Sequence, residues 1–199
     1  MKNTFDVIIV GGGPAGLFAA YYLAEHSSLN VLLIEKGKAP LKRKCPIKDV
    51  GCVKCNPCNI LCGIGGAGLF SDGKLNFIHK LGKTDLTQFL TTTKAKELIN
   101  ETEQIFNRFG MDGKVYPTDM DKAREIRKEA RKQGIELLLI KQKHLGSDNL
   151  PYHIARMAEY IADNNVAFHH SEEVTELIVE NGAIAGVVTS KATYRAPNV

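Results

Sequence analysis

The apolar residues of the first 35 positions fall into two short runs on either side of a helical pattern. The runs are FDVIIV at 5–10 and VLLI at 31–34, and both are rich in β-branched or large apolar residues. Between them, GGGPAG precedes the helical pattern LFAAYYLAEHS, so the order is strand, tight turn, helix and strand. Such strands pair in parallel through a right-handed crossover. These residues therefore predict one β-α-β unit.

The middle of the chain changes pattern twice. Residues 37–76 show no sustained period and are rich in Gly, Cys, Pro and Lys. A long loop of this composition is usually functional. Apolar positions within 85–109 then indicate one or two amphipathic helices, and another helix is expected from about Thr118, as its N-cap, to Gln133. The run IELLLIKQKHLG at 135–146 predicts a strand and a turn.

The last fifty residues alternate between the two periods. A helix is expected at about 150–163, with Pro151 in its first turn. A strand follows near 167–169. Next, TELIVE and AIAGVVTS flank Asn181-Gly182, which is a strong hairpin signal. A last strand at about 192–196 completes a small antiparallel meander.

These elements predict an α/β fold. It combines a Rossmann-like β-α-β unit and parallel sheet with a small antiparallel β-meander and a largely helical insertion. We divide the chain into 1–78, the unit with its Cys-rich and Gly-rich loop; 79–148, the insertion; and 149–199, the return to the first domain.

Composition and charge narrow the class of protein. The net charge of +4 comes from 26 basic and 22 acidic residues without a long run of one sign, which argues against a nucleic-acid partner. No apolar stretch approaches the roughly 20 residues of a membrane-spanning helix, and no signal-peptide pattern opens the chain. We therefore expect a soluble cytoplasmic protein without a membrane partner, in which structural disulfides are unusual.

The glycine turn carries the first candidate chemistry. Gly11, Gly13 and Gly16 form G-x-G-x-x-G after a strand and at the start of a helix, and Glu35 follows 24 residues after Gly11 at the end of the next strand. This arrangement suits a dinucleotide: the glycines admit a pyrophosphate at the helix N-terminus, and the carboxylate accepts from a ribose hydroxyl. The carboxylate would also repel the extra phosphate of NADP.

Which dinucleotide binds is indicated by a resemblance. The stretch DVIIVGGGPAGLFAAYYLAEHSSLNVLLIEKG resembles the amino-terminal unit of the glutathione-reductase-like flavoproteins. GGAGLFSDGKLN at 65–76, RKCP at 43–46 and HLGSDNL at 144–150 are similar to a family of FAD-dependent dehydrogenases within that superfamily. The resemblance implies FAD. It also implies an amino-terminal part of a longer enzyme, because the family continues with a strand where this chain ends.

The resemblance also implies the roles of individual residues. Gly11, Gly13, Pro14, Ala15 and Gly16 correspond to the pyrophosphate site and Glu35 to the adenosine ribose site. The adjacent Lys36 is also expected to bind the cofactor. The glycine-rich segment beside the pyrophosphate is represented by Gly65, Gly66, Gly68, Ser71 and Gly73. Val174 matches a position whose backbone meets the adenine.

All five cysteines lie between Cys45 and Cys62. The last four, Cys52, Cys55, Cys58 and Cys62, have the C-x2-C-x2-C-x3-C spacing of a [4Fe–4S] site. A second set, Cys45, Cys52, Cys55 and Cys58, has the donors of a tetrahedral zinc site, and the resemblance favours this set. A thiol redox centre and a loop without a ligand are the other two interpretations.

The function that these observations favour is an FAD-dependent oxidoreductase of the dehydrogenase type. It would have a small-molecule substrate and an unidentified electron donor or acceptor. The alternative is a non-catalytic metal or iron–sulfur protein that uses the nucleotide-binding unit as a scaffold. His144 and Asp148 either contribute an acid or base group or order their own loop.

Overall fold

The computed structural model describes residues 3–47, 51–146 and 148–199. The chain forms two compact units. The first combines Met1–Ser71 with Leu150–Val199, and the second is Asp72–Asn149. The division of the chain into functional domains at 1–78, 79–148 and 149–199 stays a prediction.

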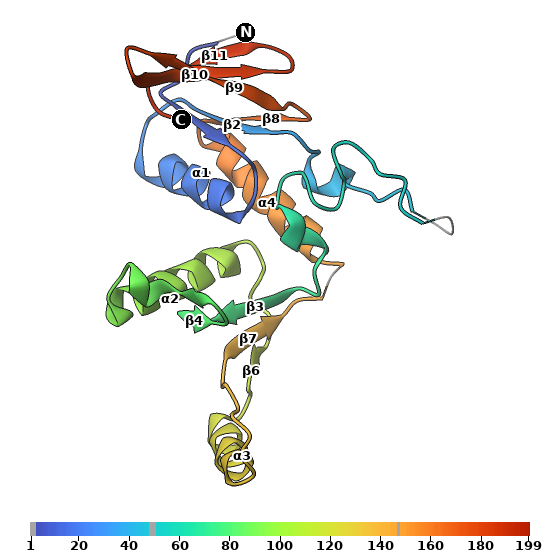
Figure 1. Cartoon of the computed structure of the whole chain (residues 1–199), viewed down its shortest axis with the longest axis vertical. Coiled ribbons are helices and arrows are strands. Elements are labelled where there is room, and N and C mark those ends of the chain that lie inside the picture. Colours follow the sequence, from blue (N-terminus) through green and yellow to red (C-terminus); the bar gives the residue numbers. More distant parts are fainter. Residues whose placement is uncertain (1–2, 48–50, 147) are drawn as a thin grey trace. The chain divides into compact units, whose positions relative to one another are not determined.

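The first unit is built around a parallel sheet. Its strands are β1 (Val7–Val10), β2 (Val31–Glu35) and β8 (Val166–His170), in the order β1-β2-β8. The helices α1 (Pro14–His26) and α4 (Leu150–Asp163) lie on one face of this sheet (Figure 1). All five residues of β2 are buried, as expected for a central strand covered on both faces.

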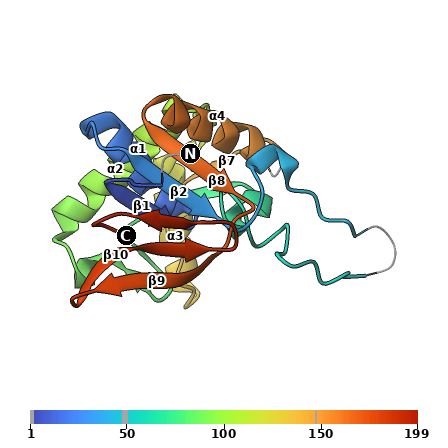
Figure 2. The same ribbon diagram turned by 90° about the horizontal axis from the view of Figure 1, so that it is seen from above.

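The other face of the parallel sheet is covered by an antiparallel meander (Figure 2). Its strands are β9 (Val174–Glu180), β10 (Ala183–Thr189) and β11 (Thr193–Arg195). Asn181 and Gly182 connect β9 and β10 with φ of 52° and 77°, as a type I′ turn requires. The core between the two sheets consists of Phe5, Ile8, Leu32, Ile34, Val187, Tyr194 and Ala196.

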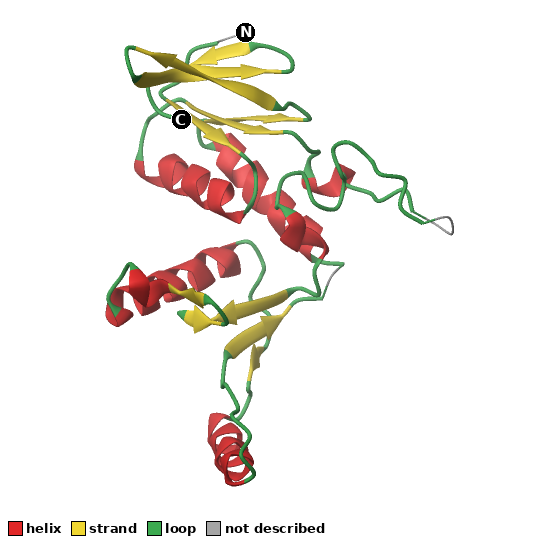
Figure 3. Ribbon diagram, viewed as in Figure 1, coloured by secondary structure: helices red, strands yellow, loops and turns green. Residues whose placement is uncertain are grey.

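A long connection follows β2 in the first unit. Apart from the short 3₁₀ turns η1 (Pro40–Lys42) and η2 (Ala67–Phe70), the described residues between Glu35 and Ser71 are loop (Figure 3). This agrees with the lack of any hydrophobic period in that stretch. The polar groups of such a loop must be satisfied by partners outside regular structure.

The second unit packs a helix against a small antiparallel sheet. The sheet has the order β3-β7-β6, with β3 (Lys74–Phe77), β6 (Val115–Tyr116) and β7 (Lys141–His144). The other elements of the second unit are β4 (Lys80–Leu81), β5 (Thr84–Asp85), η3 (Leu86–Gln88), α2 (Thr92–Arg108) and α3 (Met120–Lys132). None of the described helices is long and apolar enough to cross a membrane.

The predicted fold class is confirmed: a parallel sheet, an antiparallel meander and additional helices are all present. One detail was wrong. The N-cap of α3 is Asp119, whose carboxylate accepts from the backbone N–H of Lys122, and not Thr118. Both residue types cap well, so the pattern alone did not separate two adjacent candidates.

Candidate functional site

A pocket of about 400 Å³ opens at the carboxyl ends of β1 and β2. In open α/β sheets this edge is where ligands bind. Its walls come from the glycine turn, the end of β2, the end of the long loop and the β8–β9 turn. The lining residues are Val10, Gly11, Gly13, Ile34, Glu35, Lys36, Leu61, Cys62, Gly63, Gly66, Glu172, Glu173 and Val174.

Glu35 is the most constrained charged group of this pocket. It is 7% exposed, and its carboxylate accepts three backbone N–H groups. Gly12 donates to Oε2 at 2.8 Å, while Gly37 and Gly63 donate to Oε1 at 2.7 and 2.9 Å. Within the described ranges, Oε2 therefore has one backbone donor where a carboxylate oxygen can take two. Glu35 ties three loop segments together and keeps acceptor capacity for a ligand.

The glycine turn is held closely by its neighbours. The N–H of Gly11 donates to the carbonyl of Ile34 at 2.8 Å, and the carbonyl of Gly12 accepts from Gly65 at 2.7 Å. A Cβ at Gly16 would overlap the carbonyl oxygen of Gly11, so only glycine fits there without a shift. A Cβ at Gly13 would meet nothing within 4 Å. The open space at Gly13 is on the pocket wall, where a ligand can approach the backbone.

The structure places the predicted cofactor residues in two groups. Those that line the pocket are Gly11, Gly13, Glu35, Lys36, Gly66 and Val174. Those that do not line it are Pro14, Ala15, Gly16, Gly65, Gly68, Ser71 and Gly73. Pro14, Ala15 and Gly16 begin α1, and Gly73 belongs to the second unit. All thirteen assignments to the cofactor stay predictions.

Several pocket residues were not predicted to bind the cofactor, although Cys62 was a candidate cluster ligand. Leu61, Cys62 and Gly63 come from the end of the cysteine-bearing loop, and Glu172 and Glu173 come from the β8–β9 turn. The sequence holds only a weak signal for them: Gly63 begins the glycine-rich stretch GIGGAGLFSDG, and the other residues belong to no motif of the nucleotide site. No local pattern shows that the end of the loop folds back onto β2.

Arg43 binds the backbone of the loop end that forms one wall of the pocket. It is 4% exposed, and its guanidinium donates to five backbone carbonyls. Burial lowers the pKa of Arg43, and the nearby Glu35, Cys62 and Cys58 partly offset this. The predicted RKCP motif thus contributes a buried cation that lies near the pocket carboxylate.

The cysteines are all free thiols. Cys52 is exposed, and Cys45, Cys55, Cys58 and Cys62 are half-buried. Among the described residues, no three His, Cys, Asp or Glu side chains are gathered closely enough to hold a metal ion. Backbone N–H groups of Leu61 and Ile60 lower the pKa of Cys58. The zinc set and the cluster set therefore stay predictions.

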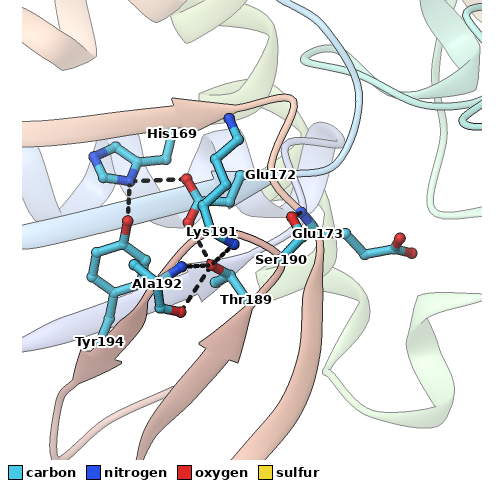
Figure 4. A network of polar contacts seen from close by, with 8 residues as sticks. All are labelled: His169, Glu172, Glu173, Thr189, Ser190, Lys191, Ala192 and Tyr194. Carbon is cyan, nitrogen blue, oxygen red and sulfur yellow. Dashed lines mark hydrogen bonds and ion pairs between the residues drawn. The ribbon is translucent and has the colours of Figure 1, made fainter.

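A buried polar network supports the opposite wall (Figure 4). Glu172 is 4% exposed and accepts the hydroxyl of Thr189 at 2.6 Å. Nδ1 of His169 lies 3.4 Å from Glu172 and 3.0 Å from the hydroxyl of Tyr194. Burial and Glu172 raise the pKa of Tyr194 to about 12. This network anchors Glu172 beside Val174, on the edge of the pocket.

The comparisons with known proteins point to the same region. Residues 6–42 match the model of the FAD dependent oxidoreductase family. The beta subunit of sarcosine oxidase from Arthrobacter is 57% identical over 37 residues, which are 18% of this chain and 9% of that protein.

Solved structures resemble nearly the whole chain at low identity. Glycine oxidase from Bacillus cereus has a TM-score of 0.55 and 14% identity, over 97% of this chain and 55% of that one. The 3-ketosteroid-delta4-(5alpha)-dehydrogenase from Rhodococcus jostii has a TM-score of 0.58 and 13% identity, over 98% of this chain and 45% of that one. The chain thus spans about half the length of these structures, and at such identities the likeness concerns the fold.

These findings concern one segment and the fold. Residues 6–42 match the FAD dependent oxidoreductase family, and the described fold is similar to those of glycine oxidase and the 3-ketosteroid dehydrogenase. The predicted resemblance to FAD-dependent oxidoreductases is confirmed. The narrower assignment to the glutathione-reductase-like superfamily stays a prediction.

Proposed function

We propose that this chain is the FAD-binding, amino-terminal part of an FAD-dependent oxidoreductase of the dehydrogenase type. The observation that carries the proposal is the position of Glu35. This buried carboxylate lies at the end of β2, in a pocket formed with the glycine turn, inside the segment that matches the family model. The alternative, a non-catalytic metal protein on the same scaffold, has no comparable support.

The described residues fit the nucleotide half of FAD. The backbone at Gly11 and Gly13 faces the pocket, and α1 begins at Pro14, so its unpaired N–H groups favour a pyrophosphate. Glu35 would accept a ribose hydroxyl through the free capacity of Oε2. The backbone of Val174 would meet the adenine. FAD, when bound, supplies the electron-carrying chemistry, and this chain's residues bind and orient it.

The pocket also fits the ligand in size and charge. Its volume of about 400 Å³ lies in the usual range for small-molecule sites. The carboxylates of Glu35, Glu172 and Glu173 suit the hydroxyl and amino groups of a nucleoside better than an additional phosphate. We infer that FAD rather than a 2′-phosphorylated dinucleotide occupies it.

A titration of the purified chain with FAD tests the proposal. We expect the chain to quench flavin fluorescence with saturable binding. The variant E35Q should bind FAD about 10- to 100-fold more weakly, because hydrogen bonds to a charged group are worth about 1.5–3 kcal/mol each. The matched control is E176Q, which changes an exposed glutamate of β9. Binding of FAD by E35Q as tight as by the wild type would contradict the role of Glu35.

The wider function is a separate proposal. The whole enzyme would act on a small molecule in the cytoplasm and exchange electrons with a donor or acceptor, without a nucleic-acid or membrane partner. Zinc or an iron–sulfur cluster at Cys45, Cys52, Cys55 and Cys58 is a prediction tested by metal content together with the visible spectrum. Protein without stoichiometric metal after anaerobic purification would remove that set.

A further inference from the structure

We propose that Arg43 is the positioning residue that holds the segment 58–66 against the nucleotide pocket. This inference rests on the proposed function, since the pocket is the one assigned there to FAD. Arg43 itself does not line the pocket. Its effect on a nucleotide is transmitted through the backbone that it binds.

The contacts of Arg43 are concentrated on one short segment. Nη1 donates to the carbonyls of Ile64 and Gly66 at 3.0 and 2.8 Å, with Gly63 at 3.4 Å. Nε donates to Asn59 at 3.0 Å, and Nη2 donates to Ile60 at 2.5 Å. A backbone hydrogen bond also stabilises the same segment: the N–H of Cys62 donates to the carbonyl of Cys58 at 2.8 Å. The loop thus has an internal scaffold in place of a helix or strand.

Only a guanidinium meets these demands. It offers five N–H donors in a fixed plane, so one side chain can satisfy carbonyls that point inward from different directions. A lysine ammonium has three donors at one point and cannot span them. Cζ of Arg43 lies 5.0 Å from the ring centre of Phe70, which adds a cation–π contact. The site is therefore specific for arginine rather than for any positive charge.

The segment that Arg43 holds is also the segment that completes the pocket. Leu61, Cys62, Gly63 and Gly66 line it. The N–H of Gly63 donates to Oε1 of Glu35 at 2.9 Å, while the carbonyl of Gly63 faces Arg43. One peptide segment thus connects the buried cation with the buried carboxylate. If Arg43 releases the segment, Glu35 loses one of its three donors and the pocket loses part of a wall.

The chemistry of a bound nucleotide adds a second reason for this position. Glu35 raises the pKa of Arg43 while burial lowers it, which means that the two opposite charges lie near one another. The cation offsets part of the negative charge of Glu35 in a pocket that would take an anionic dinucleotide. In a buried environment such a charge acts more strongly than it would in water.

The first test compares conservative and non-conservative variants. We expect R43K to bind FAD about tenfold more weakly than the wild type, and R43Q to bind it more weakly still. The matched control is R195K, because Arg195 is an exposed arginine of the same unit that pairs with Glu180. Addition of millimolar guanidinium to R43A should restore part of the affinity, and the same addition should leave R195K unchanged. R43K with an affinity within twofold of the wild type would overturn the proposal.

A second readout does not depend on FAD. Modification of each cysteine by a maleimide, followed by mass spectrometry, reports whether the segment is in place. In R43K, Cys62 should react several times faster than in the wild type, while the exposed Cys52 should react at the same rate. An unchanged rate at Cys62 in a folded R43K would overturn the proposal. If the wild type binds no FAD, the proposed function fails, but this comparison still decides the role of Arg43.

Discussion

The two units satisfy their buried charges in different ways. In the first unit, Glu35 and Arg43 are surrounded by backbone N–H and carbonyl groups of loops. In the second, the buried Glu103 binds Lys141 and, at 3.1 Å, Lys143, and the latter also donates to Asn107 at 2.6 Å. The first arrangement orders irregular backbone around a pocket, whereas the second connects α2 with β7 inside a small core.

This difference shows which charges are relevant to binding. A buried charge that is paired with another side chain needs no role beyond stabilising the fold. A charge that is satisfied by several loop peptides determines where those peptides lie, and here they form a pocket wall. Substitutions at the two kinds of charge should therefore separate stability from ligand affinity.

The largest effect on stability is expected for E103A. The substitution leaves Lys143, whose side chain is 4% exposed, without its carboxylate partner. Loss of one member of a buried pair costs about 3–5 kcal/mol in the free energy of unfolding. Urea unfolding measures it, and FAD affinity in the folded protein should stay within about twofold of the wild type. A large loss of FAD affinity in folded E103A would break the separation of the two units.

Ionisation of Glu103 should also make the free energy of unfolding depend on pH. Burial opposes ionisation of Glu103, but the hydrogen bonds from Lys141 and Lys143 outweigh it, so its pKa is lowered in the folded state. A lowered pKa contributes stability above the carboxyl's unfolded pKa of about 4.3, and the contribution disappears as the pH falls through the folded value. Acid unfolding of E103Q should therefore be less steep than that of the wild type.

A smaller and more local effect is expected from a pair of glycine variants in the first unit. G16A places a Cβ against the carbonyl of Gly11 and should lose about 1–3 kcal/mol of stability. G13A meets no protein atom within 4 Å and should keep its stability, but its methyl group enters the pocket and should weaken FAD binding. Equal stability of G16A and the wild type, measured by urea unfolding, would contradict the close approach at this position.

The smallest expected effect is a titration. Because the pKa of Tyr194 is raised to about 12, its neutral form is favoured in the folded state. The stability from this group is fully present below the unfolded tyrosine pKa of about 10 and is lost as the pH rises through 12. Ultraviolet absorbance at high pH should show a tyrosine step near pH 12, and Y194F should remove that step. A Y194F titration curve that keeps the step near pH 12 would contradict it.

Much of the fold followed from local patterns. The β-α-β unit, the helix at Leu150–Asp163 and the hairpin at Asn181-Gly182 were each predicted close to their observed bounds. Their periods and turn residues are strong because each element buries one face or requires positive φ. The cap at Asp119 and the antiparallel sheet of the second unit were not predicted, because short strands such as Val115–Tyr116 carry almost no hydrophobic period.

Within 35 residues, the sequence predicts a nucleotide site from a glycine turn, a helix and a carboxylate at the end of the next strand. The rest of the pocket depends on contacts between residues that are distant in the chain. Cys62 and Gly63 line the same pocket as Glu35, although they follow it by 27 and 28 residues in a loop that shows no hydrophobic period. Arg43, from the same loop, donates to the carbonyl of Gly63. Contacts of irregular backbone depend on where peptide groups find partners, and no local spacing encodes that.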